Sequence, residues 1–324
     1  MSVIVVTGAT GTQGGSVARL LAKNPSWKVR GITRNADSDK AKDLKALGME
    51  MVSANLDDIS TLPSAFEGAV AIFGTTNFWE IAPKRGIQAA MEEEEKQFAN
   101  IADTAAKVQT LKHLVLSTMP SCETISGGKL PCPHWDSKAR GGEYVRKTHP
   151  ELAAKTTEVW EGWYVDNLVN IPMTGPQPFL GQYLMAQPSK PESIVPVAGA
   201  VELNTGIVVK AVLEQPEKTY GKFVPILTDM IPWTTVVEGW SKTTGKTAAY
   251  AELSDAEAVK LLGPAFGKDM AQQFRFSEQH PDWYGYHPDS TVSIKDLGIE
   301  GEVYGWEKAL EYYKTRLQAL VSSS

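Results

Sequence analysis

The first 170 residues alternate between short hydrophobic runs and longer stretches in which hydrophobic positions recur at helical spacing. The short runs predict buried strands at residues 3–6, 27–33, 49–53, 69–73, 113–118 and 156–160. The longer stretches predict helices that begin near Ser16, cover residues 39–48 and 91–108, and follow Lys138 with Tyr144 and Val145 on the apolar side. Runs that are hydrophobic throughout indicate strands buried on both faces, which is typical of a parallel sheet between layers of helices.

The pattern changes beyond about residue 170, where proline becomes frequent and the alternation loosens. Short strands are predicted at residues 193–197 and 222–226, with helices near residues 206–214, 234–243, 254–262 and 306–320. The sequence therefore predicts an α/β protein with a doubly wound parallel sheet in residues 1–170 and a smaller C-terminal α/β lobe in residues 171–324. Whether the second part returns one or more elements to the first stays open.

A glycine-rich turn follows the first predicted strand. Gly8, Gly11 and Gly14 have GxxGxxG spacing and lead into a segment in which Val17 and Leu20 lie on one helix face. A helix N-terminus presents unpaired N–H groups and partial positive charge, and glycine lets a phosphate approach the backbone closely. This order of elements predicts the dinucleotide site of a Rossmann-type fold; a tight turn that binds nothing is the alternative.

The end of the second strand indicates which dinucleotide is bound. About 20 positions after such a turn, an acid suits the 2′-hydroxyl of NAD, whereas an arginine suits the 2′-phosphate of NADP. The chain has Arg34 and Asn35 here, and no acid before Asp37. Because a guanidinium matches phosphate geometry, we expect NADP(H) as the cofactor, the alternative being that Arg34 is a solvated loop charge.

Polar segments follow three further strands, and the carboxyl ends of parallel strands meet at the edge of the sheet where ligands bind. Adenine is commonly held at this edge, so Asp58 is either close to the base or an N-cap of the next helix. The other candidates at this edge are Asn55, Leu56, Asp57, Thr75, Thr76, Asn77, Ser117, Thr118 and Met119.

Composition and charge exclude several classes of protein. No apolar run in the 324 residues is long enough to span a bilayer, and the N-terminus does not resemble a signal peptide. The net charge of −6 does not favour a sequence-independent grip on nucleic-acid phosphates. We therefore expect a cytoplasmic protein, with nuclear access open, that binds neither membrane nor nucleic acid directly.

We expect the two cysteines and the acidic run at residues 92–95 to have only structural roles. Cys122 and Cys132 are too few for a disulfide scaffold, and their spacing to His134 does not match a structural zinc site, so we expect free thiols and no metal. The acidic run at residues 92–95 is expected in the first turn of its helix, where the helix dipole favours negative charge. No chemistry is assigned to it.

Several of these segments together resemble the NmrA-like family of atypical short-chain dehydrogenases/reductases. The resemblance rests on TGATGTQGGSVARLL, the Arg34–Asn35 pair, residues 76–80 and 117–120, and the helix ending at residues 143–146. It covers the first 170 residues well and is diffuse beyond them. It implies a Rossmann domain that binds NADP(H), with contacts from Gly8, Thr10, Gly11, Thr12, Gln13, Gly14, Arg34, Asn35, Asn55, Leu56, Asp57, Thr75, Thr76, Asn77, Lys138, Tyr164 and Asn167.

The resemblance also bears on catalysis. Typical members of the wider superfamily use Tyr-x-x-x-Lys with an upstream serine; here the lysine fits as Lys138, and His134 stands at the tyrosine position. A histidine can act as a general acid near neutral pH, with Ser117 or Thr118 as a hydrogen-bond partner of the substrate. Alternatively, the motif is degraded, or His134 merely begins a helix. The expected walls of the substrate pocket are Trp79, Met119, Trp135 and Tyr164.

The family contains both reductases and regulators that bind the nucleotide without turning it over. We expect an NADPH-dependent reductase of a small organic substrate such as an imine, enone or ketone. The alternative is a non-catalytic NADP(H) sensor that binds a transcription factor or another protein partner. Aromatic residues near the predicted cleft favour the enzyme. The aromatic stretch at residues 274–287 either lines this cleft or packs the interior of a small helical lobe. Residues 120–133 are expected to form a surface loop or lid, while the substrate and the oligomeric state, including a homodimer, stay open.

Overall fold

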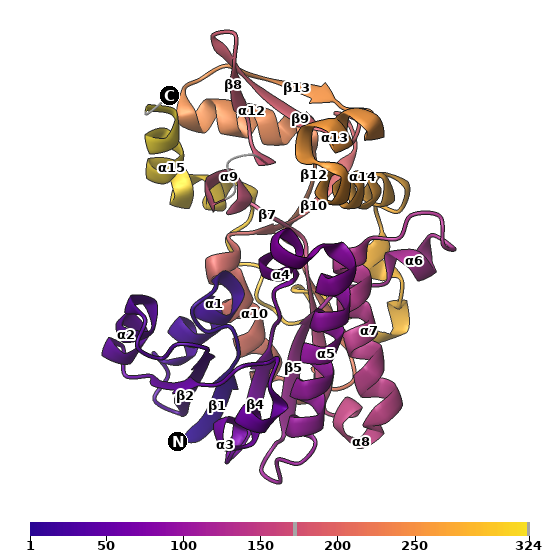
Figure 1. The fold of residues 1–324 in the computed structure, drawn as a ribbon. Coiled ribbons are helices and arrows are strands. Elements are labelled where there is room, and N and C mark those ends of the chain that lie inside the picture. The colour runs from indigo at the N-terminus through magenta and orange to yellow at the C-terminus, as the bar shows by residue number, and fades with distance from the viewer. Residues whose placement is uncertain (171–173, 323–324) are drawn as a thin grey trace.

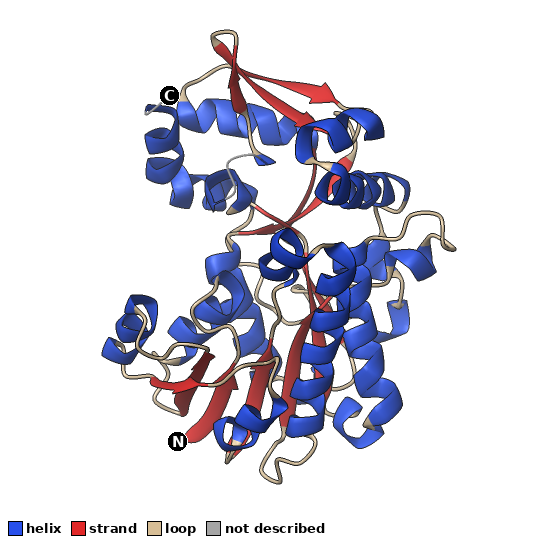
Figure 2. Ribbon diagram, in the orientation of Figure 1, coloured by secondary structure: helices blue, strands red, loops and turns tan. Residues whose placement is uncertain are grey.

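A seven-stranded parallel sheet forms the centre of the larger lobe in the computed structural model, which describes residues 1–170 and 174–322 (Figures 1 and 2). The spatial order is β11-β6-β5-β4-β1-β2-β3. The order reverses between β1 and β4, and such a reversal is where parallel sheets bind ligands. The strands are β1 (Ser2–Val6), β2 (Trp27–Thr33), β3 (Glu50–Ser53), β4 (Ala69–Gly74), β5 (His113–Thr118), β6 (Thr156–Glu161) and β11 (Phe223–Ile226). The predicted Rossmann-type α/β fold is confirmed.

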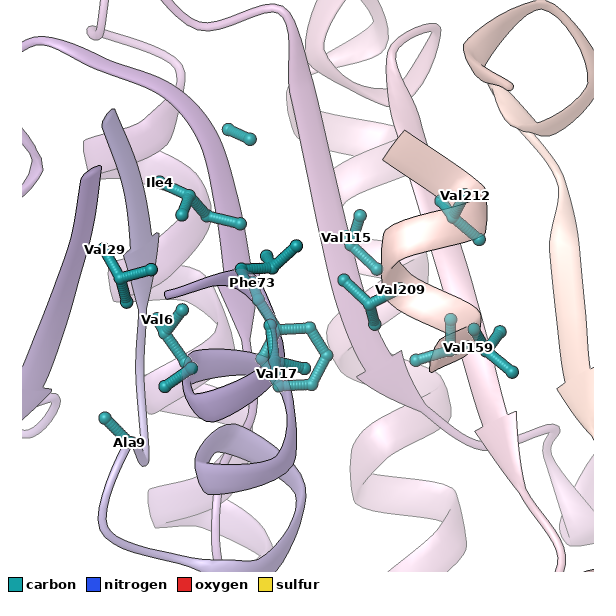
Figure 3. Packing of buried hydrophobic residues seen from close by; sticks show 14 of the residues in the cluster. Ile4, Val6, Ala9, Val17, Val29, Phe73, Val115, Val159, Val209 and Val212 are labelled. Atoms are coloured by element: carbon teal, nitrogen blue, oxygen red, sulfur yellow. The ribbon is translucent and has the colours of Figure 1, made fainter. Parts of the chain in front are cut away.

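Helices cover both faces of this sheet because its strands are apolar on both sides. On β1, Ile4 and Val6 face one hydrophobic cluster, part of which is shown in Figure 3, whereas Val5 faces another. The first cluster includes residues of α1 (Thr12–Leu21), α2 (Asp39–Ala46) and α10 (Val201–Glu214). The second includes residues of α3 (Leu62–Phe66), α5 (Ile87–Ala105), α7 (Pro133–Thr148) and α8 (Pro150–Ala153).

Residues from the second half of the chain complete the larger lobe. Strand β11 extends the sheet beside β6. Along the chain, α10 and the short α11 (Pro216–Thr219) come before β11, and β12 (Asp229–Pro232) comes after it. Helix α10 packs closely on α1, since the backbone N–H of Gly206 donates to Ser16 Oγ at 2.9 Å and a Cβ on Gly206 would lie 2.6 Å from the Ser16 carbonyl oxygen. The predicted boundary at residue 170 adjoins residues 171–173, which, like residues 323–324, lie outside the described residues.

The smaller lobe contains two three-stranded sheets and several helices (Figure 1). One sheet joins β12, β10 (Ile194–Gly199) and β7 (Trp163–Tyr164), and the other joins β13 (Ala248–Glu252), β9 (Gln182–Gln187) and β8 (Gln177–Phe179). The helices here are α9 (Asn167–Asn170), α12 (Trp233–Thr244), α13 (Asp255–Leu262), α14 (Pro264–Gln279) and α15 (Trp306–Ser322). No helix in the described ranges has both the length and the apolar character needed to cross a membrane.

Two predicted helix starts are wrong, and both errors concern the candidate site. Helix α1 begins at Thr12 rather than near Ser16, so Gly14 lies inside the helix and not in the turn. Helix α5 begins at Ile87, which places the acidic run of residues 92–95 beyond its first turn and buries Glu94 completely. The predicted loop at residues 120–133 contains one helical turn, α6 (Cys122–Ile125), and helix α4 (Phe78–Arg85) follows β4 directly.

Candidate cofactor site and active site

The glycine turn presents exposed backbone in front of the N-terminus of α1. Gly8 adopts a left-handed φ of +58°, and Gly8 and Gly11 are both exposed. Gly14 is buried, and a Cβ there would lie 2.4 Å from the Gly8 carbonyl oxygen, so only glycine allows this packing of helix against strand. The N-cap residue of α1 is Gly11, and no side chain among the described residues forms a capping hydrogen bond there. The turn therefore fits a pyrophosphate bound by backbone N–H groups.

A chain of hydrogen bonds connects this turn to the ends of β4 and β7. The side chain of Gln13 donates to the Tyr164 hydroxyl at 2.5 Å and accepts from the Thr75 hydroxyl at 3.1 Å. The hydroxyl of Thr7 accepts from the backbone N–H of Thr75 at 2.8 Å. Burial, followed by the nearby Glu161 carboxyl, raises the pKa of Tyr164, so its phenol stays neutral. Three predicted cofactor residues, Gln13, Thr75 and Tyr164, therefore lie together.

Arg34 lies at the end of β2 with 64% of its side chain exposed. One guanidinium nitrogen is 2.7 Å from a carboxylate oxygen of Glu80 on α4, and Lys84 approaches the same oxygen at 3.9 Å. Surface ion pairs of this kind contribute at most about 1 kcal/mol, so Glu80 does not prevent Arg34 from binding a phosphate. Asn35 accepts a hydrogen bond from the backbone N–H of Asp37 and shapes the turn that follows.

The segment after β3 is held in place by α5. Gln97 donates to the Asp57 carboxylate at 2.7 Å, and Asn100 donates to the Leu56 carbonyl at 2.7 Å. Asp58 accepts from the backbone N–H of Ser60 at 3.0 Å and so caps the short helix at Ile59–Thr61. The predicted cap role of Asp58 is thus present, while Asn55, Leu56 and Asp57 form a fixed, half-buried surface at the carboxyl edge of the sheet.

Lys138 is fixed by a buried carboxylate that sequence reasoning missed. The Glu94 side chain has no exposed surface and forms an ion pair with Lys138 Nζ. Glu94 also accepts hydrogen bonds from the Thr76 hydroxyl at 2.7 Å and from the Ser137 hydroxyl at 2.5 Å. A buried charge is tolerated only when it is paired and hydrogen-bonded, and Glu94 has both kinds of partner. Since Lys138 also donates to Thr76 at 3.3 Å, its ammonium group is held between α5 and the end of β4.

His134 is the second residue of α7 and lies one helical turn before Lys138, on the same side of the helix. Its ring centroid is 5.0 Å from that of Trp79, which itself contacts Phe266 of α14 at 4.9 Å. His134 Nδ1 is 2.6 Å from a carboxylate oxygen of Asp269, also on α14. The candidate acid therefore stands at the junction of the two lobes, beside the predicted pocket residue Trp79.

Other predicted residues are turned toward the interior. The Thr118 hydroxyl donates to Glu158 at 2.7 Å and accepts from Trp160 Nε1 at 3.1 Å, so its hydrogen-bonding capacity is used inside the protein. Ser117 is 4% exposed. Met119 and Trp135 belong to a buried cluster in which Trp135 contacts Phe276 and Trp283 of the C-terminal part. The remaining predicted residues are Thr10 in the glycine turn, Thr12 at the start of α1, Asn77 before α4 and Asn167 at the start of α9.

A surface hollow of about 620 Å³ lies at the amino ends of β4 and β5, lined in part by Pro63, Thr104 and Gln109. It is at the opposite edge of the sheet from the glycine turn. It therefore adds nothing to the site described above.

Comparisons with known proteins agree with this fold. The model of the NmrA-like family matches residues 1–309. The chain is 31% identical over 305 residues to the NmrA-like family domain-containing oxidoreductase cpsB of Aspergillus campestris, covering 90% of this chain and 87% of the relative. It is 28% identical to the NmrA-like family domain-containing oxidoreductase himF of Aspergillus japonicus, over the full length of both.

Solved structures of low sequence identity share the fold. The negative transcriptional regulator NmrA in complex with NADP has a TM-score of 0.75 at 19% identity, covering 99% of this chain and 97% of that one. The binary complex of leucoanthocyanidin reductase and NADPH from Vitis vinifera has a TM-score of 0.72 at 14% identity, covering 97% and 100%. The resemblance seen in the sequence is confirmed, and the chain belongs to the NmrA-like family.

Proposed function

We propose that this protein is an NADPH-dependent reductase that transfers hydride to a small organic substrate, an imine, enone or ketone. The observation that carries the proposal is the position of Lys138, which is fixed by the buried Glu94 and lies one helical turn from His134. A lysine fixed in this way, with a histidine on the same side of the helix, provides both a cofactor contact and a neighbouring proton donor, as hydride transfer requires. The relatives cpsB and himF, which are named oxidoreductases, support the same conclusion.

The residues at the carboxyl edge of the sheet fit NADP(H). The exposed backbone of Gly8 and Gly11 and the N-terminus of α1 would hold the pyrophosphate. Arg34 would bind the 2′-phosphate through the guanidinium donors that do not face Glu80. Asn55, Leu56 and Asp57 would surround the adenine. Toward the nicotinamide the contacts would come from Thr75, Thr76, Asn77, Lys138, Tyr164 and Asn167.

The chain's own residues would bind, orient and protonate. NADPH, when bound, supplies the hydride. The Lys138 ammonium would orient the ribose and stabilise negative charge that develops on the substrate heteroatom. Trp79 would shield one side of the reacting group from water, and His134 would donate the proton that completes the reduction. These tasks need only the side chains that the fold already holds at this edge.

The test is NADPH oxidation by the purified protein against a panel of imines, enones and ketones, followed at 340 nm. We expect turnover on at least one class, and its loss in Lys138→Met with the fold retained. NADP(H) binding without turnover across the panel would contradict the reductase and indicate the alternative, a nucleotide-dependent regulator that binds a protein partner.

A further inference from the structure

Asp269 is a buried carboxylate that accepts no hydrogen bond from the described residues of either lobe. It lies on α14, its side chain is 1% exposed, and neither carboxylate oxygen has a hydrogen-bond partner among the described residues. The buried thiols of Cys122 and Cys132 lie nearby, and their pKa values are raised mainly by burial and in part by the Asp269 charge. A carboxylate in such surroundings is costly unless a positively charged or N–H group compensates it.

His134 is the group positioned to compensate the charge of the Asp269 carboxylate. Its Nδ1 lies 2.6 Å from Asp269 Oδ2, although the ring and the carboxylate are not aligned as a hydrogen bond. If Nδ1 were unprotonated, its lone pair would face an oxygen lone pair at this short distance, which is repulsive. A proton on Nδ1 turns the same contact into a charge-assisted attraction. The contact therefore requires a proton between the two atoms, and we place it on Nδ1 because imidazole is ordinarily a stronger base than a carboxylate.

The other ring nitrogen is left without a partner. His134 Nε2 makes no hydrogen bond within residues 1–170 and 174–322, and the side chain keeps 11% of its surface accessible. A histidine whose Nδ1–H is held by a carboxylate presents Nε2 as its proton-exchanging atom, as in the histidine–aspartate pairs of hydrolases. Trp79 lies against the same ring, so Nε2 acts beside an apolar wall.

We infer that Asp269 is a positioning residue that fixes His134 in the Nδ1-protonated form and thereby makes Nε2 the proton donor for reduction. This inference rests on the proposed reductase function. In the step it describes, hydride from NADPH forms the new C–H bond and the substrate π bond breaks. The Nε2–H bond of the imidazolium breaks, and its proton passes to the substrate heteroatom, or to carbon in an enone. Neutral His134 then regains a proton from solvent, and NADP⁺ is released.

Catalysis then depends on a contact at the junction of the two lobes. His134 comes from α7 of the larger lobe, whereas Asp269 comes from α14 of the smaller one. Neither His134 nor Asp269 is among the proposed cofactor contacts, so loss of this pair would leave those contacts in place. The expected consequence of removing Asp269 is therefore a lower kcat with little change in the Kd of NADPH.

The first experiment reads the proton position directly and needs no substrate. Long-range ¹H–¹⁵N correlation spectra of the uniformly labelled wild type distinguish the two tautomers, and His134→Gln assigns the signal among the five histidines of the chain. We expect Nδ1 of His134 to be protonated. A neutral ring protonated only at Nε2 would overturn the inference, whether or not the protein is a reductase.

The second experiment uses Asp269→Asn, with Asp255→Asn as the matched control. Asp255 is 66% exposed and pairs with Arg275 in the same lobe, so this control also removes a carboxylate while leaving His134 untouched. We expect Asp269→Asn to change the His134 tautomer and to lower kcat about 10²- to 10⁴-fold with an unchanged NADPH Kd, while Asp255→Asn changes neither. An unaltered spectrum and kcat in Asp269→Asn would overturn the inference. If Asp269→Asn does not fold, the wild-type spectrum decides.

If no substrate is turned over but Nδ1 is protonated, the proposed function fails and the pairing of Asp269 with His134 stands. If turnover is found but Nδ1 is unprotonated, the reductase stands and the role of Asp269 is refuted.

Discussion

Replacing Glu161 with glutamine should stabilise the protein, and more so as the pH rises. Glu161 ends β6, is 4% exposed and accepts a hydrogen bond from the Thr205 hydroxyl at 2.6 Å. Its second carboxyl oxygen has no partner in the described chain. Burial raises the pKa of Glu161 to about 8, so the folded protein keeps this carboxyl protonated near neutral pH. Glutamine reproduces the size and the neutrality of that form.

The magnitude follows from linkage between protonation and folding. In the unfolded chain the carboxyl ionises above its ordinary pKa of 4.5, whereas in the folded protein it ionises only above about 8. Glu161 therefore stabilises the folded state fully below pH 4.5, and this contribution is lost as the pH rises to 8. At about 1.4 kcal/mol per pH unit the loss approaches about 5 kcal/mol over the whole range, and about 3 kcal/mol is lost by pH 7.

Urea unfolding of the wild type and Glu161→Gln at pH 5 and pH 8 measures this contribution. The free energy of unfolding of the variant, relative to the wild type, should rise by about 3 to 4 kcal/mol between the two pH values. The exposed Glu67→Gln serves as control and should show a difference that does not change with pH. A pH-independent difference for Glu161→Gln would refute the reasoning, because it would mean that the carboxyl ionises alike in both states.

Three further predictions concern the cofactor site and Lys138. Arg34→Ala should weaken NADPH binding about tenfold to a hundredfold and leave NADH binding nearly unchanged in fluorescence titrations; equal losses would remove the 2′-phosphate assignment. Gly14→Ala places a methyl group 2.4 Å from a carbonyl oxygen and should lower stability by about 1 to 3 kcal/mol and weaken nucleotide binding. Gly11→Ala, whose nearest contact is 3.3 Å, should cost less stability, and equal falls in Tm would count against this packing. Glu94→Ala leaves Lys138 without its buried partner and should cost about 3 to 5 kcal/mol in urea unfolding, so a loss below about 1 kcal/mol would show that the pair matters little.

The pattern of hydrophobic residues was sufficient to predict most strands of the larger lobe. The strands at residues 27–33 and 113–118 coincide with β2 and β5, because a run of buried apolar side chains between helices has few alternative structures. Of the short strands in the smaller lobe, the prediction at residues 193–197 corresponds to β10, and the others were missed. β8 is exposed at all of its positions, and β12 contains a charged residue and a proline, so neither shows the apolar run that marks a strand.

Glu94 could have been found from the sequence. It precedes Phe98 by four residues and Ile101 by seven, so it continues the apolar face of α5 that those residues define. An acid on a buried face needs a partner, and Lys138 was already a candidate. The run of four glutamates conceals this signal, because a helix that starts at residue 91 has all four in its first turn, where acidic residues need no buried partner.

Asp269 had no comparable signal. It lies on a helix that begins with a proline and contains Gly267, and no local pattern links it to His134 far earlier in the chain. Their contact depends on how the two lobes are packed, which neither periodicity nor spacing specifies. The partner of the candidate acid therefore becomes visible only in the folded structure.

The most direct test of the central claim uses NADPH in which both hydrogens at C4 of the nicotinamide are replaced by deuterium. The purified protein is incubated with the labelled cofactor and an imine, enone or ketone that is turned over, and the product is analysed by mass spectrometry and NMR. The proposed reductase predicts one deuterium bonded to the carbon that was reduced, with the added proton coming from solvent. Recovery of unlabelled product, or of unchanged substrate and cofactor across the whole panel, would contradict it.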